Sequence, residues 1–271
     1  MTLAHSILPV IRFDGHSVNI GRQFVSDRPR GDVVSLARVY TSVRDVDELV
    51  LLDVRATIEK RGPSLDLIRQ VSETCFVPLV YGGGIAVPAD AGACIEAGAE
   101  RVVICSAPIL NVEPLGNLIT AIAQRWGSNA VTVSVDFRRV GDDLRVVVRS
   151  GTLLTSMLVE EWAARAVELG AGEVLLQAVD RDGMMGGYDL DATRRIRSAI
   201  PDVRLIVSGG CGTYEHMAEA IDAGADAVAS GSMFVFTEST PQGARAYLAE
   251  RGYLMRPATE RFEMKEGATT L

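Results

Sequence analysis

Apolar residues follow two different spacings along this chain. Short runs rich in β-branched residues, such as Leu-Val-Leu-Leu at 49–52, have the near-continuous hydrophobicity of parallel strands buried on both faces. Between these runs, apolar positions recur every three or four residues, as on one face of a helix. We expect strands at 6–11, 48–54, 77–81, 101–105, 130–135, 173–178, 204–208 and 227–230. We expect helices at 33–40, 65–74, 89–97, 115–125, 158–169, 190–199, 214–223 and 243–251.

This alternation predicts the fold class. Eight strand–helix units predict an α/β protein with a single (β/α)8 TIM barrel, and the 271 residues suit a fold that needs about 250. A segment at 144–149 reads as a hairpin extension after the fifth strand. Since no Pro- or Ser-rich linker interrupts the pattern, we predict one domain over 1–255 and a polar tail over 256–271.

Two stretches of the chain repeat each other at a constant offset of 126 residues. Each contains a glycine-rich turn after a strand and a serine after the next strand, so that Gly84 aligns with Gly210 and Ser106 with Ser232. A long-period repeat in two copies predicts a duplicated half-barrel. Backbone N–H groups at such turns, with a hydroxyl beside them, suit a phosphate, although glycine also serves simply to make a tight turn. We therefore predict two phosphate sites at one mouth.

The composition of the chain limits the classes of molecule that it is expected to bind. A formal charge of −8 argues against nucleic acid and anionic membranes, which need a basic face, so phosphates would be held locally by backbone donors. The four cysteines have no metal-type spacing and suit free buried thiols in a reducing cytoplasm. The three histidines are scattered. We predict a cytoplasmic protein without a metal or cofactor.

Aspartates end several of the expected strands. Asp53 and Asp136 close apolar runs, and Asp180 and Asp182 follow the strand at 173–178. The catalytic face of a (β/α)8 barrel is the carboxyl end of its strands. Carboxylates gathered there would transfer protons if burial raised the pKa of at least one of them. For Asp53 and Asp180, capping a loop or pairing with an arginine is an equally good interpretation.

At this point the motifs resemble those of a known family. They are Asp-Glu-Leu-Val-Leu-Leu-Asp at 47–53, Gly-Gly-Gly-Ile at 82–85, Gly-Ala-Gly-Glu-Val-Leu-Leu at 170–176, Asp-Arg-Asp-Gly at 180–183 and Ser-Gly-Gly at 208–210. In this order, to about Leu254, the chain resembles HisF, the cyclase subunit of imidazole glycerol phosphate synthase. The resemblance implies a HisH-like glutaminase partner in a heterodimer. It also implies that ammonia travels through the barrel to a phosphorylated substrate.

The resemblance also assigns individual residues. Asp136 matches one of the family's two catalytic aspartates. Glu48, Arg101 and Glu173 match three of four charged residues around the ammonia entrance, and Ser6 stands where the fourth, an arginine, is expected. The positions that match the phosphate sites, or complete them as substrate-binding residues, are Gly84, Ser106, Asp182, Gly183, Gly210, Gly231 and Ser232.

The first strand departs from the family. Arg12 occupies the position of the other catalytic aspartate, and a guanidinium stays protonated near neutral pH and is no general base. Asp14, two residues further on, is the candidate to replace it. Cys105 replaces an asparagine of the first phosphate site.

Three functions fit these residues. The first is a HisF-like, lyase-type synthase subunit that delivers ammonia to a phosphorylated or nucleotide-sugar acceptor and has diverged from histidine biosynthesis towards amidino-sugar formation. The second is a working imidazole glycerol phosphate cyclase that uses Asp136 with Asp14 or a water. The third is a catalytically silent scaffold that activates a glutaminase. A related sugar-phosphate isomerase of the HisA type is disfavoured because it would not need the entrance charges.

Overall fold

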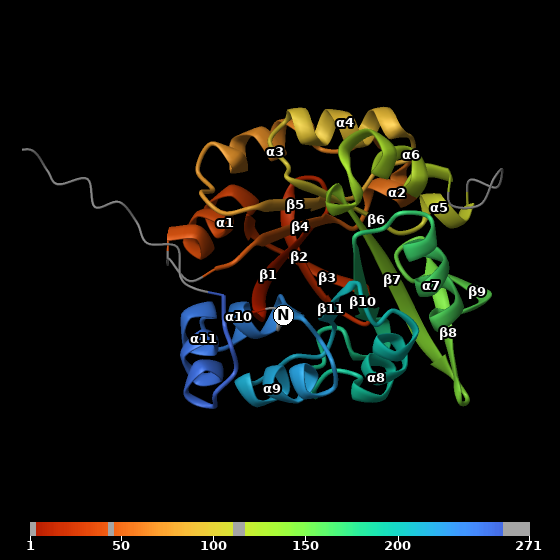
Figure 1. Cartoon of the computed structure of the whole chain (residues 1–271). Helices are drawn as coiled ribbons and strands as arrows, with labels where there is room; N and C mark the ends of the chain where they lie inside the picture. Colours follow the sequence, from red (N-terminus) through yellow and green to blue (C-terminus); the bar gives the residue numbers. More distant parts are fainter. Residues whose placement is uncertain (1–3, 43–45, 111–116, 257–271) are drawn as a thin grey trace, which may run out of the picture.

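The structure is a computed structural model that describes residues 4–42, 46–110 and 117–256. Its centre is a closed barrel of eight parallel strands, as the alternating pattern predicted (Figure 1). Hydrogen bonds join each strand to the next around the ring, and pairing of β7 with β10 closes it. In ring order the strands are β1 (Ser6–Phe13), β4 (Leu49–Asp53), β5 (Leu79–Gly82), β6 (Arg101–Ile104), β7 (Val131–Val140), β10 (Glu173–Ala178), β11 (Arg204–Ser208) and β12 (Ala227–Ser230).

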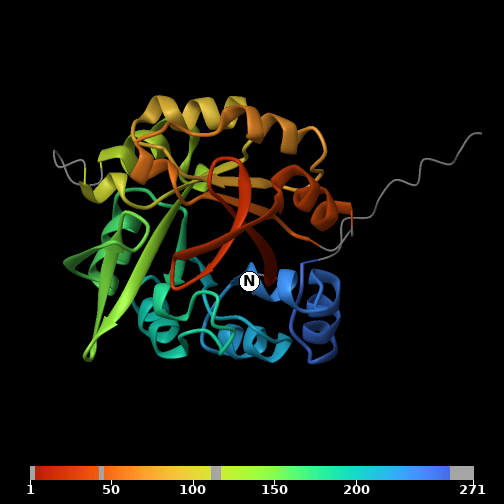
Figure 2. The ribbon, with the colours of Figure 1, turned by 180° about the vertical axis from the view of Figure 1, so that it is seen from behind.

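Helices surround the barrel, as Figures 1 and 2 show from opposite sides. Side-chain caps define where several begin: Asp189 accepts the N–H of Ala192, and Thr213 accepts that of His216, so that each satisfies a free donor of the first turn. The long helices are α1 (Val33–Ser42), α3 (Leu65–Ser72), α4 (Pro88–Glu96), α6 (Asn117–Trp126), α7 (Val159–Glu168), α8 (Leu190–Ala199), α9 (Tyr214–Asp222) and α11 (Pro241–Glu250). The shorter ones are α2 (Ala56–Glu59), α5 (Ala107–Leu110), α10 (Ser232–Phe236) and the 3-10 turns η1 (Ser128–Ala130) and η2 (Val179–Arg181).

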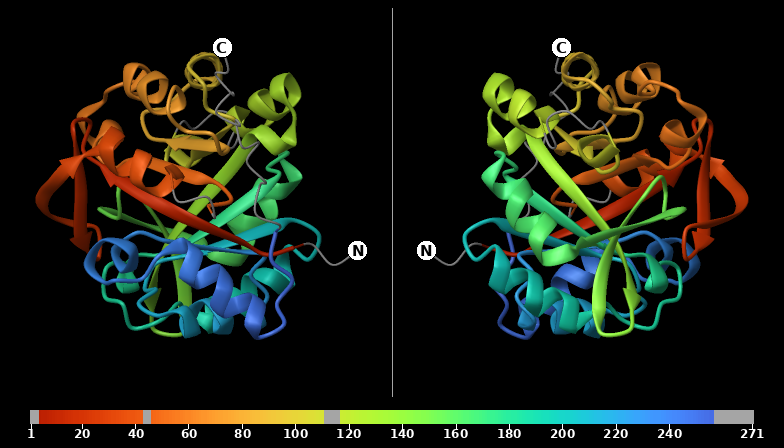
Figure 3. Two further views of the ribbon diagram at one scale, coloured as in Figure 1. Left: turned by 90° about the vertical axis from the view of Figure 1, so that its left-hand side faces the viewer. Right: turned by 90° about the vertical axis from the view of Figure 1, so that its right-hand side faces the viewer.

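All eight expected strands and eight expected helices are present, with ends that move by a few residues. The start of the helix expected at 115–125 and nearly all of the predicted tail lie outside the described residues. The two repeats fold alike, because β5, α4 and β6 correspond to β11, α9 and β12 at the offset of 126. Two features were not predicted. A hairpin of β2 (Ser17–Arg22) and β3 (Val25–Asp32) follows β1, and β9 (Leu153–Leu158) adds a third strand to the extension formed by β7 and β8 (Asp143–Val148). Figure 2 shows the hairpin in red, and Figure 3 shows the extension from two sides.

Side chains of the barrel strands alternate between two cores, as the period of two in a strand requires. Outward residues such as Ile7, Leu49 and Leu51 join the helices in one large core. Inward residues form a second, smaller core of ten apolar side chains in the middle of the barrel: Leu8, Val10, Val50, Leu52, Val80, Val103, Leu175, Ile206, Ala227 and Ala229. The charged inward residues of the described chain therefore lie at the two ends of the barrel, and Ser134 adds a hydroxyl beside Leu175 in the middle.

The two ends of the described chain meet at the amino end of the barrel. The N–H of His5 donates to the carbonyl of Leu254 at 2.7 Å, and the N–H of Arg256 donates to the carbonyl of His5 at 3.0 Å. Residues 254–256 thus lie beside the start of β1. Across the described residues, we find no helix with the length and hydropathy needed to cross a membrane.

Candidate functional site

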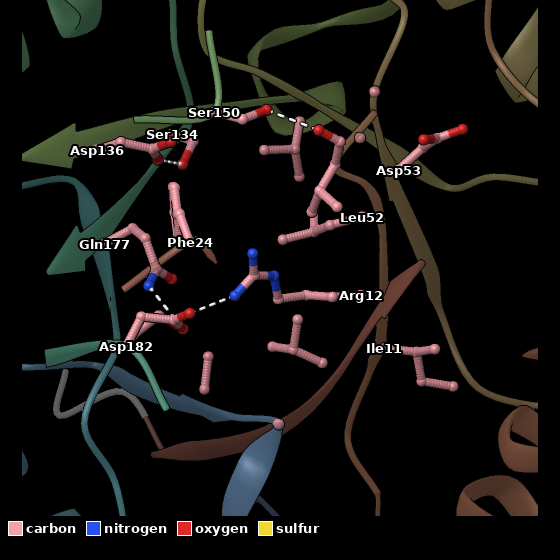
Figure 4. Close-up of a pocket in the computed structure, with 18 of the residues that line it drawn as sticks. Ile11, Arg12, Phe24, Leu52, Asp53, Ser134, Asp136, Ser150, Gln177 and Asp182 are labelled. Atoms are coloured by element: carbon pink, nitrogen blue, oxygen red, sulfur yellow. Dashed lines mark hydrogen bonds and ion pairs between the residues drawn. The ribbon is translucent and has the colours of Figure 1, made fainter. Parts of the chain in front are cut away.

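A pocket opens at the carboxyl ends of the barrel strands, where the sequence predicted the chemistry to lie (Figure 4). Residues from all eight strands or the loops that follow them line this pocket. It brings together Asp136 and all of the predicted substrate-binding positions, namely Gly84, Ser106, Asp182, Gly183, Gly210, Gly231 and Ser232. Arg12 also lines it, whereas Asp14 is not among its lining residues.

The glycine turn of the second repeat is closely packed. Gly210 has a φ of +106°, and a Cβ there would lie 2.3 Å from the carbonyl oxygen of Gly187. In the loop after β10, Gly183 is packed in the same way: its φ is +71°, and a Cβ there would lie 2.2 Å from the carbonyl oxygen of Gly21. Only glycine fits such positions, because a side chain would clash with backbone in a left-handed conformation. The turn therefore presents bare backbone to the pocket, next to Ser232 at the start of α10.

The corresponding serine of the first repeat is engaged differently. Ser106 Oγ accepts a hydrogen bond from the backbone N–H of Arg149 at 2.8 Å. Arg149 belongs to a left-handed turn in which it and Ser150 both have a φ of 53°, followed by Gly151 at 77°. Ser150 donates its hydroxyl to the carbonyl of Val54 at 2.7 Å. The loop between β8 and β9 is thus fastened across the first repeat, and the two candidate phosphate sites differ.

Asp136 is the carboxylate best placed for proton transfer. Its side chain points into the pocket from β7 and is 8% exposed. Burial raises its pKa to about 6, although the hydroxyl of Ser134, which donates to Oδ1 at 2.6 Å, and the thiol of Cys105 stabilise the ionised form. A carboxyl group with a pKa near neutrality exchanges a proton readily in either direction.

Arg12 lies across the pocket mouth from Asp136. Its side chain extends inward from β1 and forms an ion pair with Asp182 (Figure 4). Gln177 donates to the other oxygen of Asp182 at 3.3 Å, so that both carboxylate oxygens are engaged. The ring of Phe24, at the tip of the β2–β3 hairpin, covers one face of the guanidinium with 4.6 Å between Cζ and the ring centroid.

The other aspartates considered from the sequence have structural contacts. Asp53 accepts hydrogen bonds from Arg61, Ser64 and the N–H of Ala56, which organise the loop after β4. Asp180 is half-exposed and lies 3.7 Å from Nε of Arg138. Asp14 holds the turn between β1 and β2, where Oδ1 accepts the N–H of Ser17 at 2.9 Å. Burial raises the pKa of Asp14, but the N–H groups of Ser17 and His16 outweigh this effect and lower it. The structure therefore does not bring Asp14 to the pocket as a replacement base.

At the opposite end of the barrel, inward charged residues form a buried cluster. Arg101 pairs with Glu48 and, at 2.6 Å, with Glu173. Arg204 also pairs with both glutamates, at 2.9 and 2.6 Å. Burial raises the pKa of Glu48 despite these arginines, and Glu48 and Glu173 outweigh burial to raise the pKa of Arg204.

This cluster corrects one expectation. With Ser6 in place of an arginine, the sequence predicted an incomplete set of three charges, but Arg204 supplies a second cation from β11. Ser6 is buried and does not contribute a charge. Arg204 begins its strand as Glu173 begins β10 and Arg101 begins β6, but this position alone did not identify it, because only the register of β10 and β11 places Arg204 opposite Glu173. Within residues 4–42, 46–110 and 117–256, we find no cluster of side chains suited to a metal ion.

Fold and site together define a (β/α)8 barrel with a buried carboxyl group of raised pKa at the carboxyl end and an ion-pair cluster at the amino end. The family model described as histidine biosynthesis protein matches residues 6–240. Imidazole glycerol phosphate synthase subunit HisF of Thermobifida fusca is 39% identical over 262 residues, which cover 94% of this chain and all of the relative. HisF proteins of Salinispora arenicola and Nocardioides sp. are 38% and 37% identical over the same shares. The chain belongs to the HisF family.

Proposed function

We propose that this chain is the synthase subunit of a glutamine amidotransferase in which ammonia enters at the ion-pair cluster and reacts at the opposite mouth. The proposed partner is a HisH-like glutaminase, since the relatives are named as subunits of a synthase. The proposed acceptor carries phosphate at both ends and spans the Gly84 and Gly210 turns. We further propose a lyase-type nitrogen transfer outside histidine biosynthesis, in which the product is an amidino sugar.

The interior of the barrel supports an ammonia route. In the described part of the chain, the side chains between the cluster and the pocket are the apolar inward residues of the second core and the hydroxyls of Thr132 and Ser134. A small neutral molecule such as ammonia loses little on entering such an environment, whereas ammonium, as an isolated ion, loses its hydration. The cluster would act as an entrance that opens when ion pairs part. Charges that neutralise one another are tolerated in a buried position only while they stay paired.

One observation carries the proposed change of reaction, namely the ion pair between Arg12 and Asp182. A guanidinium at this position accepts no proton near neutral pH, and it also neutralises the nearby carboxylate. Asp136 is left as the acid–base group of the pocket. One such group is sufficient when ammonia displaces an activated oxygen leaving group from an electrophilic carbon of the acceptor. The C–N bond forms, the C–O bond breaks, and a single proton passes from the nitrogen to Asp136.

The experiment is an assay of the purified chain with the bis-phosphorylated HisF substrate and an ammonium salt at alkaline pH. Thermobifida fusca HisF serves as the positive control. We expect imidazole glycerol phosphate to form at least about 1,000-fold more slowly than with the control, as is usual when a catalytic acid or base is lost. A rate within about tenfold of the control would contradict the proposed divergence.

A working cyclase is the second candidate. It is favoured by the name shared by the relatives and by the pKa of about 6 at Asp136. The same assay decides between the two. A silent scaffold, the third candidate, requires Asp136→Asn to leave nitrogen transfer by the complex unchanged. A large loss of synthesis with normal glutamine hydrolysis would exclude it.

A further inference from the structure

Arg12 differs from every other residue of the pocket in charge. Among the described residues that line it, the charged side chains are Asp53, Asp136, Asp182 and Arg12, and Arg12 is the only cation. An anionic ligand therefore meets one positive side chain in this pocket. Its position decides which part of the ligand it contacts.

The order of strands around the barrel places Arg12 between the two glycine turns. β1 lies next to β12, which leads to Gly231 and Ser232, and on its other side β4 separates it from β5 and Gly84. β7, with Asp136, stands on the opposite side of the ring. A ligand that reaches from one turn to the other must pass with its middle between Arg12 and Asp136.

The contacts of the Arg12 side chain leave one direction from which a ligand can approach its guanidinium. Phe24 covers one face of the guanidinium, and NH1 donates to Asp182. A guanidinium has five N–H donors in a plane and binds a planar carboxylate through two parallel hydrogen bonds. Within the described chain, the only carboxylate paired with Arg12 is Asp182, which it reaches through one nitrogen. Further donors therefore remain for a ligand that approaches in the plane of the guanidinium.

The charge balance favours a monoanion at this point. The single positive charge of Arg12 is already shared with Asp182, and Asp136 faces it. A phosphate dianion there would place one more negative charge opposite Asp136 than a carboxylate does, with no further cation among the described lining residues to offset it. The glycine turns offer backbone N–H donors for phosphates, whereas the guanidinium of Arg12 offers N–H donors in one plane, which match a planar carboxylate.

We propose that Arg12 binds a carboxylate in the middle of the acceptor, so that the substrate is a phosphorylated sugar acid. Arg12 is then a specificity-determining residue that holds the acceptor against Asp136. The inference deepens the proposed function and rests on it in one respect, the presence of a phosphate site at the pocket.

Binding of small probes to the isolated chain tests this inference without the partner or the reaction. Two matched pairs differ in a carboxylate: 3-phosphoglycerate with glycerol 3-phosphate, and 6-phosphogluconate with glucitol 6-phosphate. Isothermal titration calorimetry should show, for at least one pair, about tenfold tighter binding of the acid by the wild type, as for a charge-assisted bidentate contact.

The variants separate Arg12 from a general effect of charge. Arg12→Met should reduce the preference to within about twofold while affinity for the compound without the carboxylate is kept. Arg12→Lys should retain part of the preference, because an ammonium keeps the charge but not the planar set of donors. Arg165→Met, which removes an exposed arginine paired with Glu168 on α7, should behave as the wild type. Thermal unfolding of each variant shows whether it is folded.

The outcomes are distinct. Equal affinities within both pairs for the wild type, or a preference that survives Arg12→Met, overturn the role of Arg12 and leave the proposed function standing. Failure of all four compounds to bind the wild type overturns the phosphate site as well, and with it this part of the proposed function.

Discussion

Ser134 donates its hydroxyl hydrogen to Oδ1 of Asp136 at 2.6 Å, two residues away on the same inward face of β7. The bond lies inside the pocket mouth, where the barrel changes from apolar to polar side chains. It stabilises the ionised carboxylate, yet burial has the larger effect and the pKa stays raised to about 6. The residue that fits catalysis best is therefore costly to keep ionised.

Asp136→Asn should stabilise the protein at alkaline pH. Because the folded-state pKa is raised from 3.8 to about 6, the stabilising effect of the protonated form is complete below pH 4 and is lost as the pH rises through 6. At pH 8 the ionised carboxylate then costs about 3 kcal/mol. Urea unfolding should show a gain of up to that size for the variant at pH 8 and none at pH 4. An equal gain at both pH values would contradict this origin. Asp182→Asn, which removes the partner of Arg12, is the control and should lose stability at pH 8.

Asp136→Asn should also lose activity. If Asp136 acts as the base, the ammonia-dependent rate of the wild type should rise with pH through an apparent pKa of about 6. Asp136→Asn should lower kcat by about 100- to 10,000-fold and remove this rise. The measurement is a pH–rate profile with ammonium salt, corrected for the concentration of free ammonia. If the rate of the variant still rises with pH, a group other than Asp136 causes the rise.

Arg204→Met should uncouple the proposed complex as strongly as Arg101→Met. Both arginines pair with Glu48 and Glu173, so that loss of either leaves buried negative charge without its balance. We expect about 3–5 kcal/mol of lost stability and more glutamine hydrolysed per product formed. Ser6→Ala, at a buried position of the same end, should leave the ratio unchanged. If Arg204→Met still hydrolyses one glutamine per product formed, Arg204 has no role in the ammonia entrance.

Ser106→Ala and Ser232→Ala should differ although the two serines are equivalent in the repeat. Ser106→Ala removes the acceptor of the Arg149 N–H, which should cost about 1 kcal/mol and speed hydrogen exchange at 149–152. In the described part of the chain, the Ser232 hydroxyl has no such structural contact, so Ser232→Ala should weaken binding of glycerol 3-phosphate about tenfold with stability unchanged. If the two variants change stability and phosphate binding equally, the two serines have the same role in both repeats.

Asp14→Ala should affect stability and not chemistry. It removes an acceptor of the N–H groups of Ser17 and His16, at a cost of about 1 kcal/mol at neutral pH. Because the pKa of Asp14 is lowered in the folded state, this difference should disappear as the pH falls below the usual range of a carboxyl group. Initial rates at saturating substrate should match the wild type. A loss of kcat without a loss of stability would restore Asp14 as a catalytic candidate.

Much of the barrel could be predicted because parallel strands buried on both faces are continuously apolar, and the helices that cover them are amphipathic. The hairpin of β2 and β3 gave no such signal. Its tip residues, Gln23 and Phe24, have φ values of 52° and 64°, where glycine or asparagine would have marked a turn. Phe24 and its contact with Arg12 were missed for that reason.

The site was predictable where it depends on local sequence and unpredictable where it depends on register. The glycine turns repeat along the chain and could be found there. Arg204 looks like an ordinary charged residue at a strand end, and only its alignment with Glu173 across β10 and β11 places it inward. Asp14 has the same parity as Arg12 and would point inward if β1 continued, but the strand ends at Phe13. Strand ends are set by contacts that the sequence alone does not display.

Closure of the barrel has a consequence for synthesis on the ribosome. Ser6 at the start of β1 pairs with Ala227 in β12, 221 residues later. At about 5–20 residues per second, one edge of β1 stays unpaired in the nascent chain for about 10–45 s. During that time it is an apolar strand with free backbone donors and acceptors, which is a common starting point for aggregation. The emerging chain is therefore a good substrate for chaperones until its last quarter has been translated.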